Sequence, residues 1–170
     1  MELVWKAFEL RPEPSPALDP HGEYLTRVWN SSVYPLSARL GVTMRMPPVQ
    51  PRSRRAHEAA RWARTLGRFD DFNAAVFRAF FERGEDIGDT GVLLKLASDL
   101  GLDESGLRAA LESGEFEPGV LEDEREAAEL GLGGVPAFIA NRRMALTGVQ
   151  PVEALRQLVE RARAPKREDT

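Results

Sequence analysis

Two groups of carboxylates have the residue types and spacing that could serve general acid–base chemistry. Asp70 and Asp71 are adjacent, and the run from Glu122 to Glu126 reads EDERE. Acid–base catalysis needs carboxyl groups that converge in one pocket with their pKa values driven apart. Neighbouring residues of a helix point in different directions and do not converge. We therefore interpret both groups as helix caps and a solvated helix face.

Cysteine and histidine, which are also common in catalytic sites, are absent or scarce in this sequence. The 170 residues contain no cysteine and two histidines, His21 and His57. A thiolate nucleophile, a disulfide and a cysteine-based metal site are therefore outside the chemistry of these residues. The histidines lie far apart in sequence, and we interpret His57 as structural or exposed. The loop from Gly84 to Gly91 (GEDIGDTG) lacks the closing Glu of a calcium-binding loop. The sequence thus predicts no metal and no cofactor.

The remaining candidate is the stretch GVPAFIANRRMALTGVQP, Gly134 to Pro151. Val135 to Ala140 is typical of a short strand, Asn141 to Arg143 of a turn, and Met144 to Leu146 of a returning strand. Pro151 is a favourable first residue for a helix. The Val135-Pro136 pair at the head of this stretch is typical of a loop that holds a substrate beside a reactive group.

Composition limits the class of protein that can carry this loop. Hydrophobic residues make up 42% and charged residues 29% of the chain, which is a globular balance. The net charge of −4 argues against a nucleic-acid partner, because such proteins carry a basic surface. No apolar run approaches the roughly 18 residues of a membrane span. The N-terminus, MELVWKAFEL, does not resemble a signal peptide. We expect no membrane partner and a cytoplasmic location.

Strands are predicted at the two ends of the chain and helices in its middle. Glu2 to Leu10 has apolar residues on both faces, which predicts a strand covered by helices. A proline-rich loop follows, and then weak helical periodicity from Gly22 to Leu40 that Pro35 interrupts.

Further helices are predicted by apolar stripes and caps. The first begins after Ser53 and the second covers Phe69 to Arg83. Asp89 and Asp103 begin the third and fourth, and the fifth covers Pro118 to Leu130.

This order predicts an α/β fold with one sheet and an inserted helical subdomain. Residues 1–21 and 131–170 form its core, and residues 22–130 form a mostly helical insertion.

Several stretches carry a family resemblance. GVPAFIANRRMALTGVQPVEALRQLV resembles the C-terminal half of a thioredoxin-like fold, and more narrowly that of DsbA-like oxidoreductases of the FrnE type. The central AFFERGEDIGDTGVLLKLASDLGLD resembles the inserted helical region of that family, and VWKAFELRPEP resembles its second strand. The resemblance covers nearly the whole chain.

The resemblance implies a function for the proline loop. In such enzymes a reactive thiolate sits at a helix N-terminus, beside a cis-proline loop. The residue before that proline offers its backbone N–H and C=O groups to an extended peptide. By this resemblance Val135-Pro136 is a cis peptide. The substrate-binding residues are Gly134, Val135, Pro136 and Ala137, and the partner is an extended peptide or protein substrate.

The chain departs from the family at its start, because the first strand and the Cys-Pro-x-Cys motif are absent. One reading is therefore an incomplete disulfide oxidoreductase that is redox-inactive alone. Another is a non-catalytic peptide-binding or partner-binding module, which forms a homodimer through an open sheet edge at Leu3 to Leu10. A third is an enzyme similar to 2-hydroxychromene-2-carboxylate isomerases and kappa-type glutathione transferases.

Overall fold

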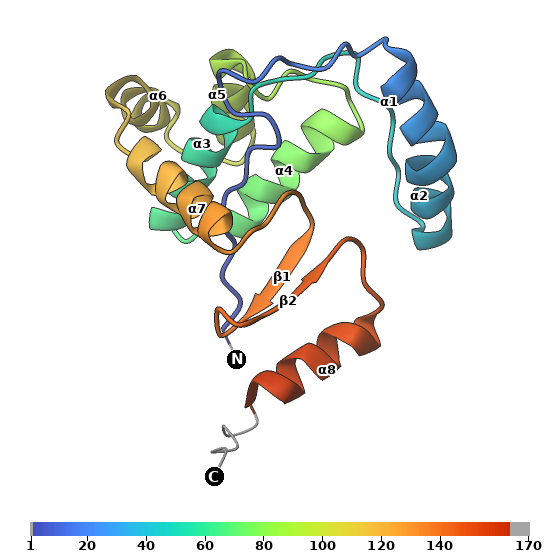
Figure 1. The fold of residues 1–170 in the computed structure, drawn as a ribbon. Helices are drawn as coiled ribbons and strands as arrows, with labels where there is room; N and C mark the ends of the chain where they lie inside the picture. The colour runs from blue at the N-terminus through green and yellow to red at the C-terminus, as the bar shows by residue number, and fades with distance from the viewer. Residues whose placement is uncertain (1, 164–170) are drawn as a thin grey trace. The chain divides into compact units, whose positions relative to one another are not determined.

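The computed structural model describes residues 2–163, in which a series of helices is followed by a two-stranded hairpin and one last helix (Figure 1). Two compact units are present. The hairpin unit is Met1–Leu10 together with Glu122–Thr170, and the helical unit is Arg11–Leu121. The expected boundaries followed residues 21 and 130, whereas these units divide after Leu10 and Leu121.

Hydrogen bonds explain why the proline-rich loop belongs to the helical unit. The guanidinium of Arg52 donates to the backbone carbonyls of Arg11 and Ser15, the latter at 2.6 Å. The Glu13–Pro14 peptide bond within this loop is cis.

The helical unit is built from helices joined by short connections. Its elements are α1 (Glu23–Val28), η1 (Trp29–Val33), α2 (Tyr34–Leu40), α3 (Arg54–Thr65), α4 (Phe69–Phe81), α5 (Thr90–Asp99), α6 (Glu104–Ser113) and the start of α7 (Glu117–Glu129).

Small residues let α3 pack closely against its neighbours. Ala59 and Ala63 are fully buried in one cluster with Phe72 of α4, Leu93 of α5 and Leu107 of α6. Burying a leucine or phenylalanine side chain stabilises a fold by about 1.5–3 kcal/mol. This cluster is therefore the main source of stability for the helical unit.

The predicted interruption at Pro35 is wrong, because α1, η1 and α2 follow one another without a break. Proline has no N–H to donate within a helix. Just before it, the N–H of Tyr34 donates to the carbonyl of Trp29, which makes one turn of π-helix. This wider turn lets the helical backbone continue through Pro35 into α2. The rings of Trp29 and Tyr34 pack edge to face with centroids 5.4 Å apart.

Two of the three predicted caps are confirmed. A carboxylate oxygen of Asp89 accepts from the N–H of Val92, and one of Asp103 accepts from the N–H of Ser105. Ser53 precedes α3 as predicted, but its side chain forms no capping hydrogen bond, so that part of the prediction is wrong. Its backbone is already helical, with φ −87° and ψ −2°, rather than extended as a capping residue requires.

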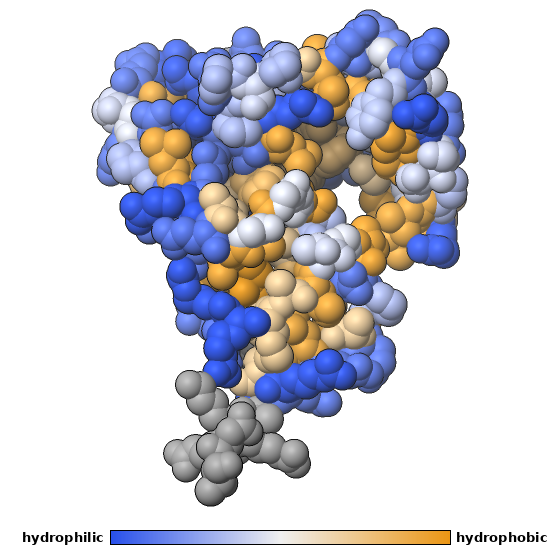
Figure 2. Space-filling view, in the orientation of Figure 1, coloured by the Kyte–Doolittle hydropathy of each residue, from blue (hydrophilic) through white to orange (hydrophobic). Residues whose placement is uncertain are grey.

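The hairpin unit carries the predicted hairpin and last helix. Strands β1 (Ala137–Ala140) and β2 (Met144–Thr147) pair antiparallel, with Ala137 opposite Thr147 and Ala140 opposite Met144. The last helix, α8 (Val152–Arg163), contacts both strands. In the space-filling view, hydrophobic residues reach the surface over the hairpin (Figure 2).

The strand predicted for Glu2 to Leu10 does not form. Figure 1 draws residues 2–10 as coil, without a helix or an arrow. The sheet in residues 2–163 consists of β1 and β2 alone. A strand exists only when its backbone pairs with a neighbouring strand. The apolar pattern is present, but this structure pairs it with no strand.

Candidate functional site

The proline loop lies at the start of the hairpin. The Val135–Pro136 peptide bond is cis, as the resemblance predicted. The backbone N–H of Gly148 donates to the carbonyl of Pro136 at 2.8 Å. This bond extends the pairing of β1 and β2 by one residue, so the hairpin holds the loop in place.

The register of the hairpin decides which backbone groups face outward. In an antiparallel pair, every second residue directs its N–H and C=O groups toward the partner strand. The bond to Pro136 sets Pro136 and Phe138 toward β2. Ala137 and Ile139 therefore direct their backbone groups to the other edge of β1, which pairs with no strand among the described residues.

Exposed apolar side chains surround the head of the hairpin. Val135 is 50% exposed and Val149 is 55% exposed. The register, continued by one residue, sets these two valines opposite each other. Among the described residues, no atom outside residues 133–135 lies within 4 Å of the position that a Cβ on Gly134 would take. The loop thus combines an open backbone edge with an accessible apolar surface.

The turn at the far end of the hairpin is held by side chains. Asn141 and Arg142 have φ values of 52° and 54°, in the left-handed region. The Asn141 amide donates to the carbonyl of Ala162 at 2.8 Å, which attaches the turn to the end of α8. The guanidinium of Arg142 forms an ion pair with Glu126.

Glu126 belongs to a group of charges that no pattern in the sequence indicated. Asp123 is buried, and its two carboxylate oxygens accept from Lys6 Nζ at 2.9 Å and from the N–H of Ala7 at 3.0 Å. Lys6 Nζ also lies 3.0 Å from Glu126. Hydrogen bonds to Asp123 and then to Glu126 raise the pKa of Lys6.

The interpretation of Glu122 to Glu126 as a solvated face is therefore wrong for Asp123. Its ion pair joins residues 117 apart in sequence, so no local signal could reveal it. These charges attach the N-terminal segment and the hairpin turn to α7.

The adjacent carboxylates Asp70 and Asp71 lie in the first turn of α4. Asp71 pairs with Arg68 at 2.8 Å on the surface of α4. In the part of the chain that the structure describes, no three His, Asp or Glu residues lie close enough together to hold a metal ion. Between residues 2 and 163, no helix is long and apolar enough to cross a membrane.

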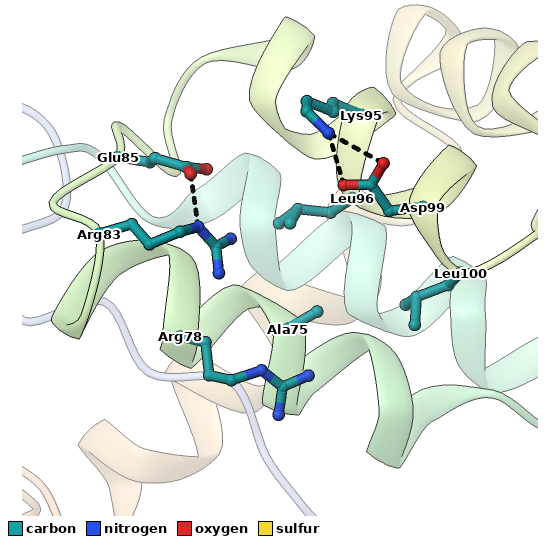
Figure 3. Close-up of a pocket in the computed structure, with 8 residues that line it drawn as sticks. All are labelled: Ala75, Arg78, Arg83, Glu85, Lys95, Leu96, Asp99 and Leu100. Carbon is teal, nitrogen blue, oxygen red and sulfur yellow. Dashed lines mark hydrogen bonds and ion pairs between the residues drawn. The ribbon is translucent and has the colours of Figure 1, made fainter. Parts of the chain in front are cut away.

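A hollow of about 360 Å³ lies in the helical unit, along α4 and α5 (Figure 3). Two ion pairs line it, Arg83 with Glu85 at 2.6 Å and Lys95 with Asp99 at 2.6 Å. Each carboxylate is thus already paired with a cation. The remaining lining is apolar apart from the guanidinium of Arg78. The hollow offers no nucleophile and no unpaired base.

Comparisons with known proteins show which family and which solved structures this chain resembles. The family model of the DSBA-like thioredoxin domain matches residues 1–160. The uncharacterised protein YwbO of Bacillus subtilis strain 168 is 35% identical over 143 residues, which cover 82% of this chain and 72% of YwbO.

Two solved structures are also similar. One is a probable DsbA oxidoreductase from Streptomyces coelicolor, with a TM-score of 0.73 and 26% identity over 95% of this chain and 76% of that one. The other, from Nitrosomonas europaea, is described as a candidate protein disulfide isomerase. It has a TM-score of 0.68 and 25% identity over 89% of this chain and 78% of its own.

Proposed function

We propose that this chain, which belongs to the DSBA-like thioredoxin domain family, binds an extended peptide at residues Gly134, Val135, Pro136 and Ala137 and performs no thiol–disulfide exchange with its own side chains. Within the family we assign it to the FrnE type. The support for that assignment is the order of the Gly-Val-Pro loop, the hairpin and the Gly-Val-Gln-Pro start of the last helix.

The open edge of β1 is the observation that carries the proposal. Backbone N–H and C=O groups of Ala137 and Ile139 face away from β2, at the spacing that an added strand requires. An extended peptide that aligns with this edge can form two or more backbone hydrogen bonds. Each such bond contributes about 0.5–1.5 kcal/mol net.

The side chains around the loop indicate which peptides fit. Val135 and Val149 are both about half exposed, and a bound peptide would cover them. Covering apolar surface contributes about 25 cal/mol per Å². We therefore propose an extended segment with apolar side chains as the ligand, recognised mainly through its backbone.

The chain lacks the thiol that thiol–disulfide exchange requires. Exchange begins when a thiolate attacks a disulfide sulfur. These 170 residues contain no cysteine, and no other side chain supplies that reaction. The chain can thus hold a peptide, whereas a reactive thiol would have to come from another molecule.

A pair of proline substitutions tests the peptide site. Ala137→Pro removes an outward N–H on the open edge of β1. Ala145→Pro removes an outward N–H on the opposite edge, at β2, and is the matched control because prolines are tolerated at strand edges. Anisotropy of labelled valine-rich peptides should show binding to the parent chain and to Ala145→Pro, and weaker binding to Ala137→Pro.

Equal binding by both variants would overturn the assigned edge. An insulin-reduction assay on the same samples tests the redox statement. We expect no reduction above the buffer rate, and reduction by the purified chain would refute this half of the proposal.

A further inference from the structure

We infer that the hollow along α4 and α5 is a binding site for a small organic carboxylate, which the guanidiniums of Arg78 and Arg83 hold over an apolar floor (Figure 3). The whole site lies within the helical unit, and it is independent of the peptide-binding function proposed above. Three features of the hollow support this assignment: unpaired cationic donors, the apolar floor and a rigid frame.

The cations of the hollow have more donors than its carboxylates use. Arg83 donates from Nε to Glu85 at 2.6 Å, and Lys95 Nζ donates to both carboxylate oxygens of Asp99, at 2.8 and 2.6 Å. In the described part of the chain, the terminal nitrogens of Arg83 and the whole guanidinium of Arg78 form no hydrogen bond and no ion pair. A guanidinium only donates. These groups therefore lack an acceptor, which the oxygens of an anion would supply.

The two guanidiniums belong to neighbouring turns of the backbone. The backbone N–H of Arg83 donates to the carbonyl of Arg78 at 3.2 Å, so the two residues lie one turn apart. Figure 3 shows the terminal nitrogens of Arg83 directed away from Glu85, toward the side of the hollow where Arg78 lies. A guanidinium fork matches the two oxygens of a carboxylate. A carboxylate at this opening can therefore accept from both arginines.

The floor of the hollow is apolar. Leu96 is 4% exposed and Ala75 is 7% exposed, and both belong to the core cluster, against which Leu100 packs. The volume of about 360 Å³ is at the small end of the range for ligand sites, which is about 300–1,000 Å³. A ligand with an apolar body would cover this floor, whereas an inorganic anion would leave it in water.

The carboxylates near the hollow favour a ligand with a single negative charge. The hydrogen bond to Glu85 raises the pKa of Arg83 most, and the charges of Glu85, Glu82 and Asp99 raise it further. These carboxylates offset much of the positive charge, so unpaired donors rather than excess charge attract the ligand. Repulsion by the same carboxylates grows with the charge of the ligand. A monoanionic carboxylate is therefore favoured over a dianion.

The turn after α4 forms a rigid frame for Arg83 and Glu85. The N–H groups of Gly84 and Glu85 donate to carbonyls in the last turn of α4, at 3.2 and 2.9 Å. Gly84 has a φ of 68°, and a Cβ there would lie 2.7 Å from Cδ of Pro48. The backbone that carries Arg83 is thus closely packed, which lowers the entropy lost when a ligand binds.

Titration of the ¹⁵N-labelled chain with phenylacetate at constant ionic strength tests the site. We expect saturating shifts of the backbone amide signals of Leu96 and Leu100, with a dissociation constant of about 1 mM because the hollow is open to water. Phenylacetamide, which has the same shape without the charge, should give no saturating shift. An equal response to both compounds, a lack of saturation at the hollow, or tighter binding of inorganic phosphate would overturn the inference.

A matched pair of substitutions separates the site from general attraction to positive charge. Arg78 and Arg39 are both exposed and each lies in the last turn of a helix, Arg78 in α4 and Arg39 in α2. Each change to glutamine removes one positive charge. We expect the dissociation constant for phenylacetate to rise at least about five-fold in Arg78→Gln and to stay unchanged in Arg39→Gln. An equal rise in both variants would contradict a specific site.

Asp99→Asn should strengthen binding. The substitution removes a carboxylate from the hollow and releases the ammonium of Lys95 from its ion pair. We expect the dissociation constant for phenylacetate to fall about three-fold. Loss of folding cannot produce tighter binding, so this variant is informative even if Arg78→Gln lowers stability. Unchanged or weaker binding by Asp99→Asn would count against the hollow as the place where the carboxylate binds.

Discussion

Lys6 and Asp123 are 117 residues apart in the chain, yet Lys6 Nζ lies 2.9 Å from Oδ1 of Asp123. The carboxylate side chain is 2% exposed, while the lysine side chain is 51% exposed. The other carboxylate oxygen accepts from the backbone N–H of Ala7. One buried side chain of α7 thus holds both a side chain and the backbone of the N-terminal segment.

Substituting Lys6 and Asp123 one at a time should lower the free energy of unfolding by unequal amounts. Lys6→Met leaves the buried Asp123 carboxylate without its cation, and we expect a loss of about 2 kcal/mol in the free energy of unfolding. Asp123→Asn keeps an acceptor for Ala7 and removes the buried charge, so we expect a loss of about 1 kcal/mol. Urea unfolding measures both. A larger loss for Asp123→Asn would contradict this account of the pair.

The raised pKa of Lys6 predicts how stability depends on alkaline pH. Hydrogen bonds with Asp123 and Glu126 raise this pKa above its usual 10.5 in the folded state. The contribution to stability is therefore fully present below about pH 10.5 and is lost as the pH rises through the folded pKa. The stability difference between the parent chain and Lys6→Met should shrink over this range. A constant difference from pH 9 to pH 12 would show that Lys6 does not titrate in the pair.

Alanine substitutions at two glycines with the same backbone conformation should separate the stability cost of backbone strain from the cost of a steric clash. Gly41 and Gly84 have φ values of 65° and 68°, and a Cβ on Gly41 would meet no atom within 4 Å. A Cβ on Gly84 would lie 2.7 Å from Cδ of Pro48. We expect Gly41→Ala to cost about 1 kcal/mol from backbone strain and Gly84→Ala to cost about 1–3 kcal/mol more. Equal losses in thermal or urea unfolding would mean that Pro48 moves aside freely.

A charge at the head of the hairpin should weaken peptide binding without unfolding the chain. Val135 is 50% exposed, so Val135→Asp should change the free energy of unfolding by less than about 0.5 kcal/mol. Its carboxylate would be desolvated beneath an apolar peptide, and we expect affinity to fall about ten-fold. Anisotropy with valine-rich peptides measures this fall. Leu66→Asp is the matched control, since Leu66 is also 50% exposed and lies in the helical unit.

The sequence by itself determined those features whose causes are local. The stripes of α3 to α8, the caps at Asp89 and Asp103, and the hairpin over residues 137–147 all arise from residues a few positions apart. The motif around Val135-Pro136 was equally readable, because loop, turn and helix start follow one another in the chain. Pro35 was misread since a proline alone does not reveal whether a π turn precedes it.

Only the tertiary structure decided how distant segments meet. The apolar pattern of residues 2–10 predicted a strand, but a strand needs a partner strand, and the pattern cannot supply one. EDERE suggested a solvated face, whereas Asp123 is buried and its charge is paired with Lys6. Likewise the register of β1 on β2, which the Gly148–Pro136 bond continues, determined which backbone groups face outward. Burial and pairing depend on contacts between residues far apart in the chain, and periodicity carries no information about them.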